Sequence, residues 1–302
     1  MGAYHKGEKQ IQALAGATLQ ANQLNGMVQG ALAPAAVQFL LGQRLAVVTT
    51  MDENGAVWIS AMVGEPGFVY PINPVQIILD ARTLAQSDPL WHNLKAGKHQ
   101  AVGMVVINFG QRRRLRVNGT ASVDGDFVVI DVIQTYSNCP KYIQKRELEH
   151  APDAASTANV RSSRTAILSE EDKVLIGSSD TFFIGTYTVE GGSDASHRGG
   201  QTGFVQALDA SHIRFPDYAG NNMFNTMGNL ALNPRLGLLF VNYVTGDTLQ
   251  VTGRAEGIEP FRWHNGEHNG HVDVLVEQVV RTTGGALGQW RFGAFSPYNP
   301  EA

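Results

Sequence analysis

The sequence is poor in cysteine, in charge and in long apolar runs. Its 302 residues include one cysteine, Cys139, which excludes an internal disulfide and a thiolate metal cluster. Charged residues make up 17% of the chain and the net charge is −4, which argues against nucleic-acid binding, because phosphate contacts need a basic surface. No stretch is apolar for 18 consecutive residues, so no membrane span is predicted. We therefore expect a cytoplasmic protein without membrane segments or a nucleic-acid partner.

Familiar catalytic motifs are missing as well. The sequence has no Walker loop, G-x-G-x-x-G, G-x-S-x-G or H-E-x-x-H pattern, which removes the nucleotide, serine-hydrolase and zinc-peptidase interpretations. His264, Glu267, His268 and His271 have spacings that resemble zinc ligands, but the interleaved Asn-Gly pairs favour an exposed turn. Cys139 has no base near it in sequence, which argues against a nucleophile. No metal site is therefore predicted.

What the chain has instead is an internal repeat. Gly67-Phe68-Val69 recurs 136 positions later as Gly203-Phe204-Val205, and Val117-Asn118-Gly119 recurs 134 positions later as Val251-Thr252-Gly253. A two-residue deletion in a loop explains the change of spacing. Because glycines and apolar runs keep their order through both copies, we interpret the chain as a tandem duplication.

Within each copy the pattern is typical of β-strands separated by turns. An apolar run over 44–51 is followed by Asn54-Gly55 and by a second run over 57–63, which predicts a β-hairpin. Residues 181–189 repeat the first run. Strands at this spacing, with one short helix in each copy, predict a small antiparallel barrel per repeat.

Three segments lie outside the repeat. Residues 4–42 are expected to be helical, with a second short helix opening at Pro34. The apolar stripe of the first helix would comprise Ile11, Leu14, Leu19 and Leu24. Residues 138–150 are predicted as a bridging helix, because Asn or Cys can cap it and Pro fits its first turn, and residues 151–164 as a surface linker. The tail is expected to hold a strand over 272–280 and an aromatic ending.

Polar side chains gather in two loops of the second copy. Ser196, His197 and Arg198 stand just before two glycines, which allow close approach of the backbone. A second loop, over 217–222, leads into a short helix that carries Asn225 and Thr226. An Arg fork, hydroxyl and amide donors and helix N-terminal amides together suit a phosphate or another small anion. The alternative is that these loops only cap strands.

A basic run begins one strand of the first copy. Arg112, Arg114 and Arg116 would share one face of that strand, and their charges repel unless an anion or carboxylates offset them. A phosphate contact, a salt bridge between subunits and a solvated strand edge all explain the run, since edge strands are often charged against aggregation.

Seven segments together form a recognisable pattern. They are Gly64–Val69, Arg112–Gly119, Asn138–Gln144, Asp180–Ile184, Ser196–Gly200, Pro216–Leu230 and Gly246–Ala255. With them the chain resembles the pyridoxamine 5'-phosphate oxidase-related, FMN-binding split-barrel proteins, specifically the long branch with two repeats. The resemblance spans nearly the whole chain.

The resemblance implies a fold class that is mainly β (α+β). Two tandem split β-barrels of the FMN-binding type would form an intrachain pseudo-dimer, with N-terminal and linking helices and with FMN in the groove between the barrels. The implied organisation is an N-terminal helical segment (1–42), a first split-barrel repeat (43–137), a linking helix and linker (138–164), a second split-barrel repeat (165–262), and a C-terminal strand with an aromatic tail (263–302).

The resemblance also implies which residues hold the cofactor. In simple members an Arg on one strand and a Ser-Arg-Lys turn bind the FMN phosphate; Arg198 matches that Arg. Residues 220–222 match the turn, but here Asn replaces the charged residues. Met62 stands at the Arg198 position of the first copy, so one FMN per chain is expected. The full expected set is Ser196, His197, Arg198, Asp217, Gly220, Asn221, Asn222, Asn225, Thr226, Arg114, Arg116, Lys141 and Tyr142.

The implied function is that of an FMN-dependent oxidoreductase that transfers hydride at the flavin N5 to or from an unidentified small molecule. His197, Lys141 and Tyr142 are candidates to face the ring, and no catalytic residue is assigned. The vitamin B6 oxidase itself is not expected, because its C-terminal substrate residues have no clear counterpart. Two alternatives are a flavin storage protein without turnover, and a split barrel that binds haem or another ligand through His197 or His212. Pairing of two chains as a homodimer stays open.

Overall fold

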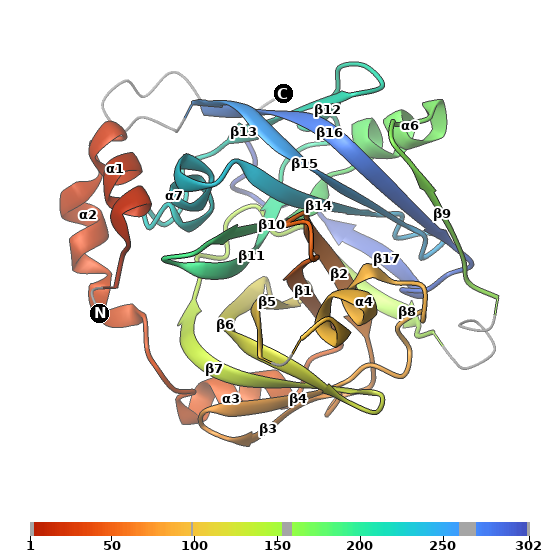
Figure 1. The fold of residues 1–302 in the computed structure, drawn as a ribbon, viewed down its shortest axis with the longest axis horizontal. Helices are drawn as coiled ribbons and strands as arrows, with labels where there is room; N and C mark the ends of the chain where they lie inside the picture. The colour runs from red at the N-terminus through yellow and green to blue at the C-terminus, as the bar shows by residue number, and fades with distance from the viewer. Residues whose placement is uncertain (1–2, 98, 153–158, 260–269, 301–302) are drawn as a thin grey trace.

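Most of the described strands form two large antiparallel sheets with the same strand order (Figure 1). The computed structural model describes residues 3–97, 99–152, 159–259 and 270–300. The first sheet contains β1 (Leu45–Met51), β2 (Val57–Val63), β3 (Val69–Asn73), β4 (Gln76–Asp80), β5 (Gln100–Asn108), β6 (Arg113–Asp124) and β7 (Phe127–Ser137). The second contains β10 (Thr181–Thr188), β11 (Gly192–Gly199), β12 (Gln206–Ala207), β13 (His212–Asp217), β14 (Arg235–Val241), β15 (Thr248–Glu259) and β16 (Gly270–Thr283), with β9 (Arg161–Thr165) paired to β16.

The two sheets have the same strand order. The first runs β2-β1-β5-β6-β7-β4-β3 and the second runs β11-β10-β14-β15-β16-β13-β12, so β1 corresponds to β10 and β7 to β16. A buried side-chain contact is also repeated: Asn93 Nδ2 donates to Thr50 Oγ1 over 2.9 Å, and Asn229 Nδ2 donates to Thr186 Oγ1 over 3.0 Å. The predicted fold class, mainly β with two split barrels, is confirmed.

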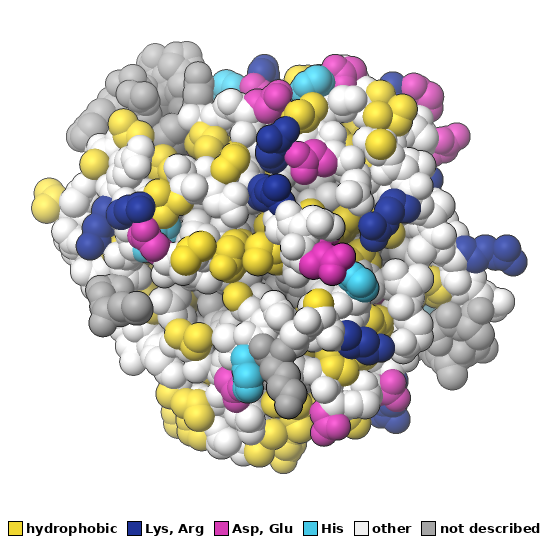
Figure 2. Space-filling model, viewed as in Figure 1, with side chains coloured by type: hydrophobic (Ala, Val, Ile, Leu, Met, Phe, Trp, Pro, Cys, Tyr) yellow, Lys and Arg dark blue, Asp and Glu magenta, His cyan; other side chains and the backbone are white. Residues whose placement is uncertain are grey.

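Short helices and a small third sheet complete the molecule. The helices are α1 (Lys6–Leu14), α2 (Thr18–Gln23), the 3₁₀ turn η1 (Asn25–Met27), α3 (Pro34–Leu41), α4 (Pro89–Lys95), α6 (Glu170–Ser178) and α7 (Asn225–Leu232). The third sheet pairs β8 (Lys145–His150) with β17 (Gln289–Ala294). Figure 2 shows basic and acidic side chains interspersed on one face of the molecule, with no large patch of only positive or only negative charge on that face. No helix in the described ranges is long and apolar enough to cross a membrane.

Glycines let the two barrels meet backbone to backbone. A Cβ on Gly103 of β5 would lie 2.5 Å from the Cα of Asp194 on β11, and one on Gly237 of β14 would lie 2.7 Å from a β2 carbonyl oxygen. A Cβ on Gly185 of β10 would lie 2.5 Å from a side-chain atom, Oγ1 of Thr49 on β1. Contacts this close exclude any side chain, so the glycines fix the distance between the barrels. An apolar cluster that contains Val47 and residues of β14 lies between them.

The N-terminal prediction is correct in part. Pro34 is the first residue of α3, as expected, but the single apolar stripe is wrong. Ile11 is buried in the core of the second barrel, whereas Leu14 and Leu19 are 51% and 77% exposed. The cause is Gly16, whose φ of +68° separates α1 from α2 and breaks the helical register.

The predicted helix over 138–150 is wrong. Tyr142 has a left-handed φ of +65°, which ends helical geometry, and residues 145–150 form β8. The partner of β8 is β17, whose paired residues lie 139 or more positions away in sequence. A local sequence pattern could not predict this pairing. The predicted linker 151–164 is also wrong at its end, because residues 161–165 form β9. The tail strand expected over 272–280 lies within β16.

Candidate functional site

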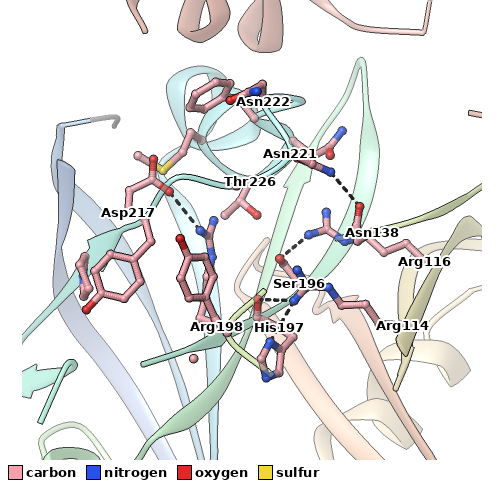
Figure 3. A pocket seen from close by; sticks show the side chains of 18 of the residues that line it. Arg114, Arg116, Asn138, Ser196, His197, Arg198, Asp217, Asn221, Asn222 and Thr226 are labelled. Carbon is pink, nitrogen blue, oxygen red and sulfur yellow. Dashed lines mark hydrogen bonds and ion pairs between the residues drawn. The ribbon is translucent and has the colours of Figure 1, made fainter. Parts of the chain in front are cut away.

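A cleft opens where β6 of the first barrel meets β11 and the start of α7 of the second (Figure 3). It collects all the predicted cofactor-binding residues except Lys141. Those that line it are Arg114, Arg116, Tyr142, Ser196, His197, Arg198, Asp217, Gly220, Asn221, Asn222, Asn225 and Thr226. Side chains from both repeats therefore face one cavity.

Arg198 reaches into the cleft from β11. Its Nη1 donates to Oδ1 of Asp217, at the end of β13, over 3.0 Å. Asp217 is buried, and this ion pair holds the half-buried guanidinium in place. The Nε of Arg198 is buried without a hydrogen-bond partner among the described residues. The arginine therefore keeps donor capacity for a ligand.

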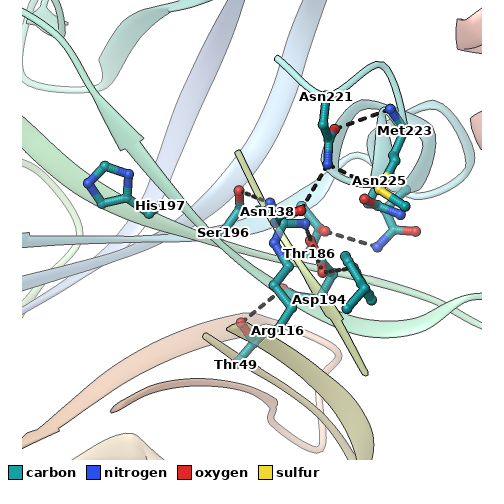
Figure 4. A network of polar contacts seen from close by, with 12 residues as sticks. Thr49, Arg116, Asn138, Thr186, Asp194, Ser196, His197, Asn221, Met223 and Asn225 are labelled. Carbon is teal, nitrogen blue, oxygen red and sulfur yellow. Dashed lines mark hydrogen bonds and ion pairs between the residues drawn. The ribbon is translucent and has the colours of Figure 1, made fainter. Parts of the chain in front are cut away.

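Arg116 connects the two repeats (Figure 4). It is buried on β6, and its Nη1 lies 3.0 Å from Oδ2 of Asp194 on β11. Its Nη2 donates to Oγ of Ser196, and Tyr136 donates to the same Asp194 carboxylate over 3.0 Å. A buried charge needs such partners. The network fixes the Ser196 hydroxyl at the wall of the cleft.

Arg114 holds His197 as a neutral imidazole. The Nη1 of Arg114 lies 2.9 Å from Nδ1 of His197, whose ring meets Phe109 and Phe183 edge to face. Burial, followed by the charge of Arg114, lowers the pKa of His197 well below its usual value. Because Nδ1 accepts a hydrogen bond, the proton of the ring lies on Nε2. Burial and the neighbouring Arg116 lower the pKa of Arg114 to about 9.

The start of α7 points donors at the cleft. Asn222 and Phe224 both have left-handed φ values, of +62° and +57°, and Phe224 provides no side-chain cap for the helix. The first amides of α7 thus lack the usual side-chain acceptor. The side chain of Asn225 is fixed by α1, because its Nδ2 donates over 2.5 Å to Oε1 of Glu8. Burial raises the pKa of Glu8 to about 7.

The cleft has more donors than acceptors. Arg114, Arg116 and Arg198 bring three cationic groups, of which two are paired with Asp194 and Asp217. Three buried nitrogens lack a partner among the described residues: Nε of Arg114, Nε of Arg198 and Nε2 of His197. A phosphate group accepts several hydrogen bonds and carries the negative charge that this donor set lacks. The residues of the cleft therefore fit the phosphate-bearing cofactor implied by the sequence.

The basic run is divided by the fold. Arg112 does not share a face with Arg114 and Arg116, because it lies in the turn before β6 with a φ of +51°. Its Nε donates to the carbonyl of Ile143 over 2.9 Å and its Nη2 to that of Phe295 over 2.7 Å. Arg112 thus ties the C-terminal tail to the β5–β6 turn, and the expectation of one common face was wrong.

The sequence interpretation missed several residues of the cleft. Asn138 lies with its Oδ1 2.8 Å from Nδ2 of Asn221, and the rings of Tyr218 and Tyr142 lie 5.3 Å apart. Phe204 stacks against Tyr218 at 6.4 Å. Tyr218 lies within the loop 217–222 that the sequence had assigned to the site, so its position in the sequence could have identified it as a cleft residue. Asn138 begins one of the segments that carry the family resemblance, but only the fold brings it beside Asn221.

The equivalent place in the first repeat is occupied by a side chain. Ser60 stands at the Ser196 position and Gln250 at the Arg116 position. The Ser60 hydroxyl donates over 2.5 Å to one oxygen of Asp88, and Gln250 Nε2 lies 3.3 Å from the other. Asp88 is the N-cap of α4, and Met62 replaces Arg198. A carboxylate of the protein takes the place that an anionic ligand would need.

The remaining candidates lie away from the cleft. His264, Glu267 and His268 fall outside the described residues, and within the described ranges no group of three metal-ligating side chains occurs. His212 pairs with Asp209 over 2.9 Å and does not line the cleft. Cys139 is half-buried.

In comparisons with known proteins, a family model matches the second repeat of the chain. Residues 168–275 match the family model described as pyridoxamine 5'-phosphate oxidase. No curated protein matches the chain. Similar solved structures include HupZ of Group A Streptococcus, 15% identical over 37% of this chain and 91% of that one, with a TM-score of 0.29. A FAD-binding protein of Mesorhizobium loti is 16% identical over 41% and 97%, with a TM-score of 0.29, and an F420 reductase is 14% identical over 37% and 95%, with a TM-score of 0.26.

Proposed function

We propose that the chain is a flavoprotein that binds FMN in the cleft between its barrels, and the match of residues 168–275 to the pyridoxamine 5'-phosphate oxidase family model supports this. The observation that carries the proposal is the surplus of donors there. Arg114 and Arg198 each have an unpartnered buried Nε, and α7 begins without a side-chain cap. A dianionic phosphate supplies the acceptors and the negative charge that such a donor set needs.

In this proposal the phosphate lies against Arg198, Ser196 and the first amides of α7. Arg116 positions Ser196, and the ion pair with Asp217 positions Arg198. Asn221 and Asn222 supply neutral donors where a positive charge is absent. The carboxylate of Asp88 in the first repeat supports this arrangement, because it receives the donors of Ser60 and Gln250 in the equivalent place. One FMN per chain follows.

FMN supplies hydride transfer at its N5, and the protein supplies position and charge. Tyr142 and Tyr218 offer apolar faces to a ring, and neutral His197 offers an Nε2 proton. Arg114 remains cationic at neutral pH and places a fixed positive charge beside His197. These features favour an oxidoreductase that acts on a small molecule over a haem-binding protein, since His197 packs against two aromatic rings.

The test compares ligands that differ only in the phosphate. Apo-protein is titrated with FMN and with riboflavin, and dissociation constants are taken from flavin fluorescence. We expect FMN to bind at least about tenfold more tightly, because a charge-assisted contact contributes about 1.5 kcal/mol or more. Equal affinities would refute the phosphate site. Oxidoreductase function then requires the reduced holo-protein to be reoxidised by a quinone faster than free reduced FMN; an equal or slower rate supports flavin storage.

A further inference from the structure

An ion pair fills the outer corner of the second barrel. Arg281 on β16 donates from its Nε to Oδ1 of Asp172 on α6 over 2.8 Å, and its Nη2 lies 3.2 Å from Oγ of Ser169, the N-cap of that helix. Next to it β9 pairs with β16, with Thr165 opposite Val279. Helix, strand and ion pair together close the space between α6 and the sheet.

The first barrel has small side chains in the same places. Leu115 is paired with Ser137 in the β6–β7 ladder, as Leu249 is paired with Arg281 in the β15–β16 ladder, so Ser137 corresponds to Arg281. Ala36 and Ala33 stand 136 positions before Asp172 and Ser169, and Ala33 is likewise the N-cap of its helix. The ion pair is therefore replaced by three small residues.

The strand pairing is also lost on this side. Gln29 forms a single bridge with Thr135, in the position where Thr165 pairs with Val279, and the preceding residues turn away as η1. What results is a groove between α3, η1 and the adjoining ends of β6 and β7. We call it the α3 groove. It shares Arg114 and Asn138 with the FMN cleft, so the two cavities adjoin.

The walls of the α3 groove are apolar and cationic. Phe39 and Leu115 are buried, and alanines of 31–36 also line the groove. The guanidinium carbon of Arg113 lies 5.2 Å from the centroid of the Phe39 ring. No carboxylate of the described residues forms an ion pair with Arg113 or Arg114. Thr135 is only 4% exposed, and its hydroxyl lacks a hydrogen-bond partner among the described residues.

We propose that the α3 groove binds a small planar aromatic anion. The apolar walls receive its ring, Arg113 its negative group, and the Thr135 hydroxyl a polar substituent. Resting on the proposed function, the inference further assigns the groove to the compound that exchanges electrons with the flavin, because the groove adjoins the FMN cleft at Arg114 and Asn138. The negative group can be a carboxylate, a sulfonate or a phosphate, since each accepts hydrogen bonds from a guanidinium. The probe used below carries a sulfonate.

The test uses anilinonaphthalene sulfonate, an aromatic anion that fluoresces in apolar surroundings, with the complete chain. Saturable binding of one probe per chain is expected. The double variant Ala36→Asp, Ser137→Arg rebuilds the ion pair of the second barrel and should abolish that binding. Ala33→Trp blocks the groove by bulk if the double variant folds poorly. Ala96→Trp, at an exposed alanine outside every cavity described here, serves as the control.

Charge is tested separately from shape. Arg113→Gln should weaken anilinonaphthalene sulfonate binding about tenfold but leave binding of the neutral analogue N-phenyl-naphthylamine unchanged. Probe binding that persists in both groove-filling variants would overturn the proposal. FMN affinity is measured in the same variants and should not change. In the unaltered chain, probe binding without FMN binding would count against the FMN site alone, and FMN binding without saturable probe binding would count against the groove alone.

Discussion

Replacing Arg198 with methionine gives the second barrel the residue that the first barrel carries at Met62. The change removes a guanidinium of which one nitrogen, Nη1, is engaged by Asp217 and another, Nε, is buried without a partner among the described residues. The side chain of methionine is apolar and similar in length, so the cleft should keep its shape. The variant therefore isolates the charge and the hydrogen bonds.

The expected magnitude follows from those contacts. A hydrogen bond to a charged group contributes about 1.5–3 kcal/mol, and each 1.4 kcal/mol is about tenfold in affinity. Arg198→Met should thus weaken FMN binding about 10- to 150-fold. Riboflavin, which lacks the phosphate, should bind the variant and the parent chain equally. The ratio of the two dissociation constants is the quantity to measure.

Flavin fluorescence titrations on both proteins give this ratio. Arg254→Met is the matched control, because Arg254 is an exposed arginine of β15 whose only described ion pair is with Glu277, at 2.7 Å. Asp217 loses an ion-pair partner in the variant, so thermal unfolding is recorded as well, and Asp217→Asn is added if folding is impaired. An unchanged preference for FMN over riboflavin would refute the phosphate assignment of Arg198.

Two further predictions concern stability. The pKa of Glu8 is raised from 4.5 to about 7 in the folded protein, so stability falls as pH rises through that interval, by up to about 3 kcal/mol. In Glu8→Gln the urea midpoint should depend less on pH between pH 5 and pH 8 than in the parent chain. An equal dependence on pH in both proteins would contradict the raised pKa of Glu8. Gly103→Ala places a Cβ 2.5 Å from the Asp194 backbone and should cost about 2–3 kcal/mol in urea unfolding. Gly26→Ala, with nothing within 4 Å, should cost far less, and equal losses would rule out the close approach of the barrels.

Local patterns were enough for much of the fold. The hairpin of β1 and β2 was predicted because two apolar runs and an Asn-Gly turn lie within twenty residues of each other. The equal strand order of the two sheets agrees with the 136-residue spacing. Ser196, His197 and Arg198 share one strand and residues 217–226 one loop and helix start, so each group was recognisable from sequence, but their meeting in one cleft depends on the fold, since four strands separate β11 from β13 in the sheet.

Other features depend on partners distant in sequence. β8 is a strand only because β17 pairs with it, and its local sequence allowed a capped helix instead. Arg114 and Arg116 reach the second barrel because glycines such as Gly103 let the backbones touch. Glu8 meets Asn225 across 217 positions, which no periodicity could indicate.

The sequence by itself therefore determined the repeat, the strands and the set of polar residues available for an anion, since each depends on short-range spacing. Only the tertiary structure decided which arginines face the cleft, that Asp88 closes the equivalent place in the first barrel, and that Ala36 and Ser137 leave a groove open. The reason is physical: charge balance and unfilled space are properties of side chains brought together from separate strands, and they exist only once the two barrels have packed.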